Sequence, residues 1–340
     1  MQKITVNASK SYDVCICGDR SAFPLKLYAG RKVALVSDDI VFPLYGEKVR
    51  ALFPQSETFP FVFPAGESSK RAEIYLAALS FLAKNGFSRK DAVIALGGGV
   101  VGDLAGFVAS TYMRGVSLYQ IPTTLLAMID SSVGGKTAID LPEGKNLVGT
   151  FYQPDGVYID LSAQHTLPEK ERVNGFGELI KYAFLSRGVG KEDLVFPATE
   201  KVVSACVKIK ADIVAADEKE DGRRMLLNLG HTVGHAIEML SGYTLPHGLC
   251  VLKGLAAAIG ISQKLYGFSK ETEREMRELL SSAHAAGKVD FSLPFAKEEI
   301  IRAIFHDKKA AGNEVNFVAI KKIGDCEIVR LPIAELEKLL

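Results

Sequence analysis

Short apolar runs alternate with helical patterns along the first half of the chain. The runs are continuously apolar or β-branched, as in strands of a sheet that is covered on both faces. They lie at residues 33–37, 59–63, 92–96, 117–121 and 157–161. Between the second and third runs, the apolar residues of segment 67–85 recur at helical spacing, and Gly86 is suited to end that helix. Strands that alternate with helices predict a parallel α/β layer.

Helical patterns dominate the second half of the chain, where the strand signal fades. They lie at residues 168–185, 198–216, 225–241, 249–265 and 270–283. Two β-rich runs around Gly324, at residues 315–320 and 326–331, predict a minor pair of strands. The expected fold class is therefore α/β, with a Rossmann-like nucleotide-binding domain at residues 1–165 and a mainly α-helical domain at residues 166–340.

A glycine-rich loop follows the third predicted strand. Gly97, Gly99 and Gly102 satisfy the spacing G-x-G-x-x-G between a strand and a helix. Glycines at these positions let the backbone approach a pyrophosphate, whose charge is then stabilised by the N–H groups that begin the helix. The spacing by itself is also compatible with a tight β–α turn that binds no ligand.

The position of this loop departs from the usual dinucleotide fingerprint. That fingerprint follows the first strand, and an acidic residue roughly 20 positions later binds the ribose. Here the strand after the loop, at residues 117–121, ends without an acidic residue. Ribose contacts must then come from elsewhere, and Asp38, just after the first predicted strand, and Glu67 are the candidates.

Three of the six histidines, His231, His235 and His247, lie close together in the sequence. His231 and His235 share a helix face at i, i+4, and His247 follows a Leu-Pro step that suggests a loop end or a helix start. Histidine is the commonest metal ligand, and a catalytic zinc ion is bound by three protein ligands, so Glu178 is a candidate for a carboxylate ligand. From the spacing alone, histidines that are satisfied by ordinary hydrogen bonds are an alternative of similar weight.

Polar and charged residues are embedded among glycine, serine and apolar residues between positions 122 and 146. They are Asp130, Lys136, Lys145 and Asn146, and they are followed later by Lys181, Lys210, Arg224, Lys308 and Lys309. A phosphate or carboxylate substrate requires such donors to converge on one cleft. For any single lysine, a solvated surface position is the more common case.

The composition narrows the range of partners. Lys plus Arg number 41 and Asp plus Glu 40, which argues against nucleic acid or a membrane as the main partner but allows a small anionic substrate. The five cysteines form no C-x-x-C pair, and residues 1–20 lack the apolar run of a signal peptide. The apolar segment 249–261 is too short to span a bilayer. We therefore expect a cytoplasmic protein.

Taken in order, these segments resemble the 3-dehydroquinate synthase family. Among them are Leu96-Gly-Gly-Gly-Val-Val-Gly-Asp103 and Asn228-Leu-Gly-His-Thr-Val-Gly-His235. The others lie at residues 66–70, 106–146, 178–181, 247–248 and 307–309, so the resemblance spans most of the chain. It implies an N-terminal NAD domain and a C-terminal helical metal-binding domain, with the active site in the cleft between them.

The resemblance also implies roles for individual residues. Metal ligands, for zinc or cobalt, are Glu178, His231 and His247. Residues at the NAD are Asp38, Glu67, Lys70, Gly98, Gly99, Asp103, Thr123, Thr124, Lys136 and Lys145. Residues around the substrate are Asp130, Lys136, Lys145, Asn146, Lys181, Lys210, Arg224, Asn228 and His235. Arg114 is implied to reach the neighbouring subunit's site, which makes a homodimer the expected assembly.

The implied reaction belongs to the shikimate pathway of aromatic amino acid biosynthesis. It converts 3-deoxy-D-arabino-heptulosonate 7-phosphate into 3-dehydroquinate and phosphate through transient oxidation by NAD, elimination of phosphate, re-reduction and aldol closure. The sequence departs from the usual family pattern at Asn174 and Phe176, at Leu249 and Cys250, and in a short segment after Leu185. None of these departures removes an implied metal ligand.

Three other functions share part of this sequence pattern. A related cyclase acting on a neutral sugar phosphate would lack part of the carboxylate-binding set, so Lys210, Arg224 and residues 307–309 favour the acid substrate. A metal-dependent polyol dehydrogenase would convert NAD into NADH stoichiometrically. A non-catalytic nucleotide-binding protein would have no need for three metal ligands and a cationic cleft.

Overall fold

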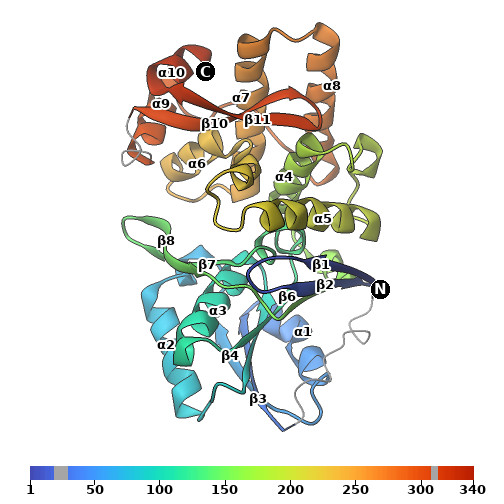
Figure 1. Ribbon diagram of the computed structural model, residues 1–340, viewed down its shortest axis with the longest axis vertical. Coiled ribbons are helices and arrows are strands. Elements are labelled where there is room, and N and C mark those ends of the chain that lie inside the picture. Colours follow the sequence, from blue (N-terminus) through green and yellow to red (C-terminus); the bar gives the residue numbers. More distant parts are fainter. Residues whose placement is uncertain (19–29, 308–312) are drawn as a thin grey trace. The chain divides into compact units, whose positions relative to one another are not determined.

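A computed structural model describes residues 1–18, 30–307 and 313–340 (Figure 1). The chain divides into two compact units. Unit 1 consists of Met1–Thr166 and Lys210–Glu218, and unit 2 consists of Leu167–Ile209 and Lys219–Leu340. The segment Lys210–Glu218, which we expected in the second domain, therefore belongs to unit 1.

Unit 1 is built on a seven-stranded sheet with the order β1-β2-β9-β6-β5-β3-β4. Its strands are β1 (Gln2–Val6), β2 (Tyr12–Cys17), β3 (Lys32–Asp38), β4 (Glu57–Phe63), β5 (Ala92–Gly97), β6 (Ser117–Pro122) and β9 (Gly156–Asp160). Neighbouring strands are parallel except for β1 and β2. The expected α/β class is confirmed, and each of the five apolar runs is a strand of this sheet. Strands β1 and β2 were not predicted: β1 is a mostly exposed edge strand with a polar pattern, and β2 is buried but short, with Asp13 interrupting its apolar residues.

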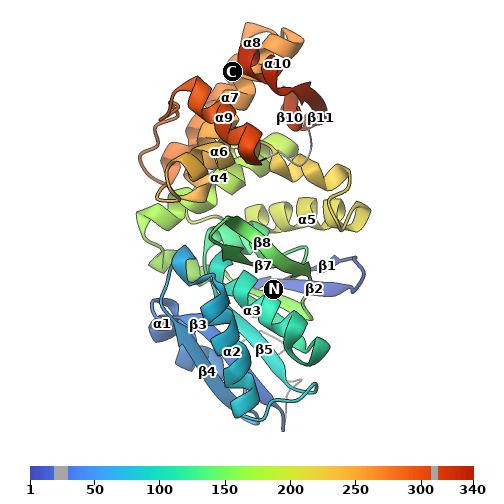
Figure 2. The same cartoon turned by 90° about the vertical axis from the view of Figure 1, so that its left-hand side faces the viewer.

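Helices cover this sheet. They are α1 (Val41–Arg50), α2 (Ala72–Lys84) and α3 (Gly99–Thr111), with short 3-10 turns η3 (Glu67–Ser69), η4 (Tyr112–Arg114) and η6 (Leu161–Thr166). Figure 2 shows α2 and α3 side by side over the sheet, and their apolar residues share one core with alternate residues of β3 and β5. The predicted helix after residue 67 is thus a 3-10 turn followed by α2, and Gly86 follows it with φ +64°, a conformation that favours glycine.

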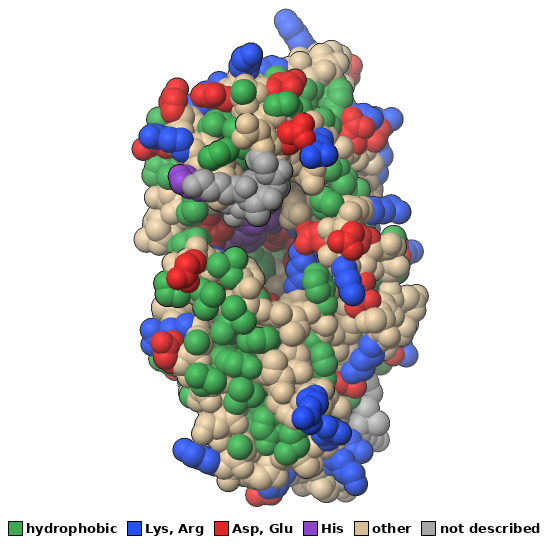
Figure 3. Space-filling model, turned by 60° about the vertical axis from the view of Figure 1, so that its left-hand side comes forward, with side chains coloured by type: hydrophobic (Ala, Val, Ile, Leu, Met, Phe, Trp, Pro, Cys, Tyr) green, Lys and Arg blue, Asp and Glu red, His purple; other side chains and the backbone are tan. Residues whose placement is uncertain are grey.

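A second, two-stranded sheet in unit 1 was not predicted. It is the hairpin of β7 (Lys136–Leu141) and β8 (Gly144–Phe151), preceded by the π-helical segment η5 (Ala127–Ser131). Strand β7 packs against α3, whereas most of β8 is exposed, including Leu147, Val148 and Phe151. Figure 3 shows hydrophobic side chains gathered over part of the surface of unit 1.

Unit 2 is mainly helical around α7 (His247–Tyr266), which contacts α4, α6, α8, α10 and β10. Its other elements are α4 (Glu169–Leu185), η7 (Lys191–Asp193), η8 (Arg223–Asn228), α6 (His231–Leu240), α8 (Lys270–Ser281), η9 (Ser282–Ala285), α9 (Lys297–Asp307), β10 (Glu314–Lys322), β11 (Asp325–Pro332) and α10 (Ile333–Leu339). Helix α5 (Glu200–Ala216) begins in unit 2 and ends in unit 1. The predicted strand pair around Gly324 is the antiparallel hairpin of β10 and β11.

Helix α7 is longer than the apolar segment that predicted it. By length and mean hydropathy (1.3) it could cross a membrane, but 61% of its apolar window is buried. A core helix passes the same test of length and composition. Because α7 is surrounded by other elements of unit 2, we interpret it as a core helix.

One predicted helix is wrong in its extent. Residues 225–241 were expected to form a single helix, but η8 ends at Asn228 and α6 begins at His231. Gly230 separates them with φ +79°, and a Cβ atom there would lie 2.9 Å from Leu255 Cγ. The left-handed residue redirects the chain, so Asn228 lies before the turn and both His231 and His235 lie after it.

The close packing of α3 on β7 gives a test of this fold. A Cβ atom on Gly106 would lie 2.3 Å from Thr137 Cγ2, so Gly106→Ala should lower the free energy of unfolding by about 1–3 kcal/mol. Gly260, inside α7, has open space around it, and Gly260→Ala should be neutral or stabilising by up to about 1 kcal/mol. Urea unfolding of the two variants measures both changes, and equal effects would contradict the packing.

Candidate functional site

The carboxyl ends of three central strands of unit 1 meet at one edge of its sheet. Strand β3 lies between β4 and β5, so the chain passes from β3 to β4 on one side and then to β5 on the other. This reversal is a topological switch point, where open α/β sheets bind their ligands. Asp38 ends β3, and Gly98 and Gly99 follow β5 and begin α3. Thr123 and Thr124 follow β6, the next strand along the sheet.

The backbone at this edge is tightly packed around the glycine loop. A Cβ atom on Gly98 would lie 3.1 Å from Thr124 Cγ2, and one on Gly99 would lie 3.2 Å from Ser131 Oγ. The Oγ1 atom of Thr123 is buried and has no hydrogen-bond partner among the described residues. A buried hydroxyl without a partner costs free energy, so a ligand that bonds it here would be favoured. This edge therefore fits a dinucleotide.

Asp38 is fixed by the start of α1. Its Oδ1 atom accepts hydrogen bonds from the backbone N–H groups of Ile40 and Val41, at 3.0 and 2.7 Å. Burial raises the pKa of Asp38, and these two bonds oppose the rise. The carboxylate is thus oriented before any ligand binds, and Oδ2 is the oxygen that these two bonds do not use.

A polar network joins η3, α3 and the β7–β8 hairpin. The Lys70 Nζ atom lies 2.6 Å from Asp103 Oδ2 and also donates to Asn146 Oδ1, and Lys145 Nζ lies 3.4 Å from Glu67 Oε1. Burial lowers the pKa of Lys70, but the carboxylates of Asp103 and Glu67 raise it by more than burial lowers it. The net shift is upward, so the amine is charged. Five residues that the resemblance implied, in three separate stretches of sequence, are brought together here.

Asp130 and Lys210 form a second pair in unit 1. Lys210, on the part of α5 that belongs to unit 1, donates to the backbone oxygen of Asp130 at 2.8 Å and forms an ion pair with its carboxylate. Both residues were expected at the substrate. Lys136 is exposed at the start of β7, and Arg114 is exposed with φ +66° at the end of η4.

Three histidines and a glutamate converge in unit 2. Glu178 lies on α4, His231 and His235 lie on α6, and His247 is the first residue of α7. The Glu178 Oε1 atom lies 3.1 Å from His247 Nε2 and 3.4 Å from His231 Nε2. The nitrogens that His231, His235 and His247 offer lie within 4.8 Å of one another. Helix α7 contacts both α4 and α6, so the side chains from the three helices form a single group of donors.

The hydrogen bonds of the His231 and His247 rings identify which ring nitrogens are left for a metal ion. His231 Nδ1 lies 3.1 Å from the Leu229 carbonyl oxygen, and His247 Nδ1 lies 3.1 Å from Glu238 Oε2. Both partners are acceptors, so each Nδ1 donates to them, and each Nε2, which faces Glu178, is the ring nitrogen left for a metal ion. Two imidazole nitrogens and a carboxylate oxygen that lie close together form a donor set that fits a divalent cation such as zinc.

Local charges keep this carboxylate ionised. Burial raises the pKa of Glu178, but the Lys181 amine and the His231 ring lower it well below its usual range. Burial lowers the pKa of His247, whereas its hydrogen bonds to Glu178 and Glu238 raise it to about 9. Lys181 forms an ion pair with Glu178 Oε2 one helical turn away, and its side chain is 2% exposed.

Further predicted site residues lie in unit 2. Arg224 lies on η8 and is 1% exposed. Asn228, at the end of η8, donates to Glu220 Oε1 at 2.8 Å. His235 is exposed, and its ring centroid lies 5.0 Å from that of His231. Lys308 and Lys309 lie outside the residues that the structure describes.

The sequence analysis did not predict two residues that form hydrogen bonds with the first two residues of α7, His247 and Gly248. Glu238, on α6, accepts from the His247 ring, and Asn174, on α4, accepts a hydrogen bond from the Gly248 N–H at 2.7 Å through Oδ1. The signal for Glu238 was a carboxylate seven positions after His231, on nearly the same face of the helix. The sequence marked Asn174 only as a departure from the usual family pattern, because its contact with α7 depends on how two distant helices pack.

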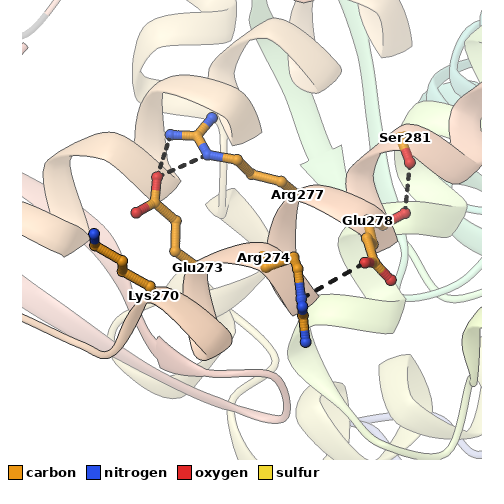
Figure 4. Close-up of a pocket in the computed structure, with 6 residues that line it drawn as sticks. All are labelled: Lys270, Glu273, Arg274, Arg277, Glu278 and Ser281. Carbon is orange, nitrogen blue, oxygen red and sulfur yellow. Dashed lines mark hydrogen bonds and ion pairs between the residues drawn. The ribbon is translucent and has the colours of Figure 1, made fainter.

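An open depression beside α8 is a weaker candidate site (Figure 4). It is lined by Lys270, Glu273, Arg274, Arg277, Glu278 and Ser281. Arg277 and Glu273 pair at 2.7 Å, and Arg274 and Glu278 at 3.9 Å, both at i, i+4. These charges compensate one another along an exposed helix face, so the depression offers no concentrated charge for a ligand.

Comparisons with known proteins identify the family of this chain. The family model described as 3-dehydroquinate synthase N-terminal matches residues 60–174, and the one described as C-terminal matches residues 175–310. A 3-dehydroquinate synthase from Streptococcus suis (strain 05ZYH33) is 38% identical over 99% of both chains. One from Enterococcus faecalis (strain ATCC 700802 / V583) is 41% identical over 92% of this chain and 90% of the relative.

The fold is also found in a solved structure of another enzyme. A crystal structure of 2-deoxy-scyllo-inosose synthase, complexed with carbaglucose-6-phosphate, NAD+ and Co2+, has a TM-score of 0.88 at 22% identity and covers 99% of each chain. This likeness shows the fold, whereas the family models and the curated relatives span most of the sequence at much higher identity. The chain therefore belongs to the 3-dehydroquinate synthase family.

Proposed function

We propose that the chain converts 3-deoxy-D-arabino-heptulosonate 7-phosphate into 3-dehydroquinate and phosphate, using NAD and a divalent metal ion. The observation that carries this proposal is the convergence of Glu178 with the Nε2 atoms of His231 and His247. A carboxylate and two imidazoles are a common ligand set of catalytic zinc, in which a further position stays open to the substrate. The family to which the chain belongs supports the choice of reaction.

The residues present fit both cofactors. Glu178, His231 and His247 would hold the metal ion, and the sheet edge with Asp38, Gly98 and Gly99 would hold the dinucleotide. When bound, NAD supplies a hydride acceptor that is regenerated in the cycle, and the metal ion supplies a Lewis acid for the substrate's hydroxyl groups.

Positive side chains would bind the anionic groups of the substrate. Lys181 and Arg224 are buried cations of unit 2, and we propose that they fix its charged end by charge-assisted hydrogen bonds. Lys136, Lys145 and Asn146, on the β7–β8 hairpin, are proposed to bind phosphate or dinucleotide. Such contacts orient the reacting atoms and supply charge, which are the two main contributions of a protein to phosphate elimination.

Polar side chains would orient the hydroxyl groups and carry protons. A ring nitrogen of His235, exposed beside the His231 ring, is proposed to accept or return a proton of a substrate hydroxyl. Asn228 is proposed to donate a hydrogen bond to a neighbouring hydroxyl. Because Lys210 is bound to Asp130, we propose that these two act as a pair in which Lys210 holds the Asp130 carboxylate in place.

A direct assay tests the function. Protein with zinc, NAD and the heptulosonate phosphate should release phosphate and form dehydroquinate without net NADH, because the hydride is returned. His231→Ala should lose bound zinc and turnover together. Folded, zinc-loaded protein that releases no phosphate would refute the proposal, and stoichiometric NADH from polyols would indicate a dehydrogenase instead.

The unpartnered hydroxyl of Thr123 gives a second test, on the dinucleotide. Thr123→Val removes a buried polar atom, so the protein without NAD should gain about 1 kcal/mol of stability. If the hydroxyl bonds the dinucleotide, the same change should weaken NAD binding by roughly tenfold. Thermal unfolding and calorimetric titration with NAD measure the two effects, and Thr123→Ser, which keeps the hydroxyl, is the control. Unchanged NAD affinity in the valine variant would exclude this contact.

We further propose a cytoplasmic homodimer in which Arg114 serves the neighbouring subunit. None of the five cysteines forms a disulfide, which is usual in a reducing compartment. Arg114 is exposed in a left-handed conformation that is uncommon for this residue type, and such conformations often occur at functional sites. The exposed apolar side chains of β8 would gain from burial in an interface.

Subunit mixing tests the role of Arg114. Arg114→Ala and His231→Ala should each be inactive. If Arg114 acts across the interface, dimers mixed at random from the two variants should recover about a quarter of wild-type activity, because half of them are hybrids with one intact site. Mixing two samples of the same variant is the control. Absence of recovery, although hybrids form, would place Arg114 in its own subunit's site or outside any site.

A further inference from the structure

Glu238 is a buried carboxylate that none of the proposed binding and proton-transfer steps uses. It lies on α6, and its side chain is 7% exposed. An ionised carboxylate is costly to bury unless polar or charged groups compensate it. Its Oε2 atom lies 3.1 Å from His247 Nδ1, so a compensating partner is the proposed metal ligand itself.

The two proposed ligand rings obtain their Nδ1 partners in different ways. His231 and His247 are each the first residue of a helix, α6 and α7, where the unpaired backbone groups are N–H donors rather than acceptors. The Leu229 carbonyl, two residues before His231, accepts from the His231 Nδ1 atom, whereas the His247 Nδ1 atom is bonded to the side chain of Glu238 on another helix.

The two nitrogens of the His247 ring have different roles. Glu238 accepts at Nδ1, which holds a hydrogen there, and Nε2, which lies 3.1 Å from Glu178 Oε1, is then the nitrogen that would lose its hydrogen and offer a lone pair to a metal ion. Without an acceptor at Nδ1, the hydrogen could move to Nε2, and the ring could also turn about its side-chain bonds. Glu238 thus controls both the tautomer and the direction of the ring.

We propose that Glu238 is a positioning residue for His247, which holds the Nε2 lone pair toward the metal site. This inference rests on the metal site proposed above. A carboxylate that accepts from the second nitrogen of a ligating histidine also increases the basicity of the ligating nitrogen. Glu238 touches neither substrate nor cofactor in this role, and it acts only through the ring.

Zinc affinity measured with zinc alone tests the proposal. Glu238→Gln keeps the shape but offers a neutral, weaker acceptor, and its dissociation constant for zinc should rise about tenfold by competition with a chelator. Glu238→Ala offers no acceptor and should approach a hundredfold loss, on the order of the largest effects of such partners. The visible absorption spectrum of the Co2+-loaded protein should change in both variants, because the ligand geometry changes.

Ser262→Ala is the matched control, because Ser262 is a buried residue of α7 whose Oγ accepts a hydrogen bond from the Ile320 N–H at 2.9 Å. It should lower the melting temperature of the metal-free protein and leave zinc affinity and the Co2+ spectrum unchanged. A purely structural role for Glu238 would give the same result as this control.

The outcomes separate this proposal from the one on which it rests. If the wild-type protein binds no zinc, the proposed metal site fails. If the wild type binds zinc, His231→Ala loses it and both Glu238 variants bind it like the wild type, the inference about Glu238 alone is overturned. If Glu238→Ala does not fold, Glu238→Gln decides: a tenfold loss supports the role of Glu238, and wild-type affinity overturns it.

Discussion

The burial of one carboxylate, Glu178, is the constraint on which the rest of unit 2 depends. Only 2% of this residue is exposed, and an ion in such a place must be matched by charge and hydrogen bonds. Lys181 supplies the charge from the same helix, and His231 and His247 supply the bonds from two others. Three helices must therefore keep a fixed mutual arrangement for one side chain to remain ionised.

Small residues make this arrangement possible. A Cβ atom on Gly177 would lie 2.1 Å from the Gly248 carbonyl oxygen, and one on Gly248 would lie 1.9 Å from the Asn174 carbonyl oxygen. The backbones of α4 and α7 are thus in contact immediately beside Glu178 and His247. The backbone contact sets the distance between the two helices. At this distance the side chains of Glu178 and His247 can reach each other. Asn174, a departure from the usual family pattern, serves this packing by accepting from the Gly248 N–H.

Periodicity predicted the elements that are regular and buried, and it failed where tertiary contacts decide. Strand β5 is apolar along its whole length and was easily predicted, whereas the exposed strand β1 and the β7–β8 hairpin carry no comparable pattern. The prediction of one continuous helix at residues 225–241 was wrong, because Gly230 adopts a left-handed conformation that its sequence context does not reveal.

Sequence reasoning about the site had the same limits. The spacing of His231 and His235 placed both on one helix face, but only the fold brings Glu178 and His247 to them from elsewhere in the chain. The ligand set itself came from the resemblance to a family rather than from spacing. The partners of those ligands, Glu238 and Asn174, followed from neither, because each depends on the packing of α6 or α4 against the start of α7.

The path of the chain between the two units has a consequence for protein engineering. The chain crosses from one unit to the other after Thr166, after Ile209 and after Glu218, and the second crossing falls inside α5. Neither unit is a single continuous piece of polypeptide, and the family models divide the sequence at yet another place, after residue 174. A fragment cut at any one of these points would leave a unit without its full set of segments, so exchange of halves with a homologue requires transplanting two separate stretches together.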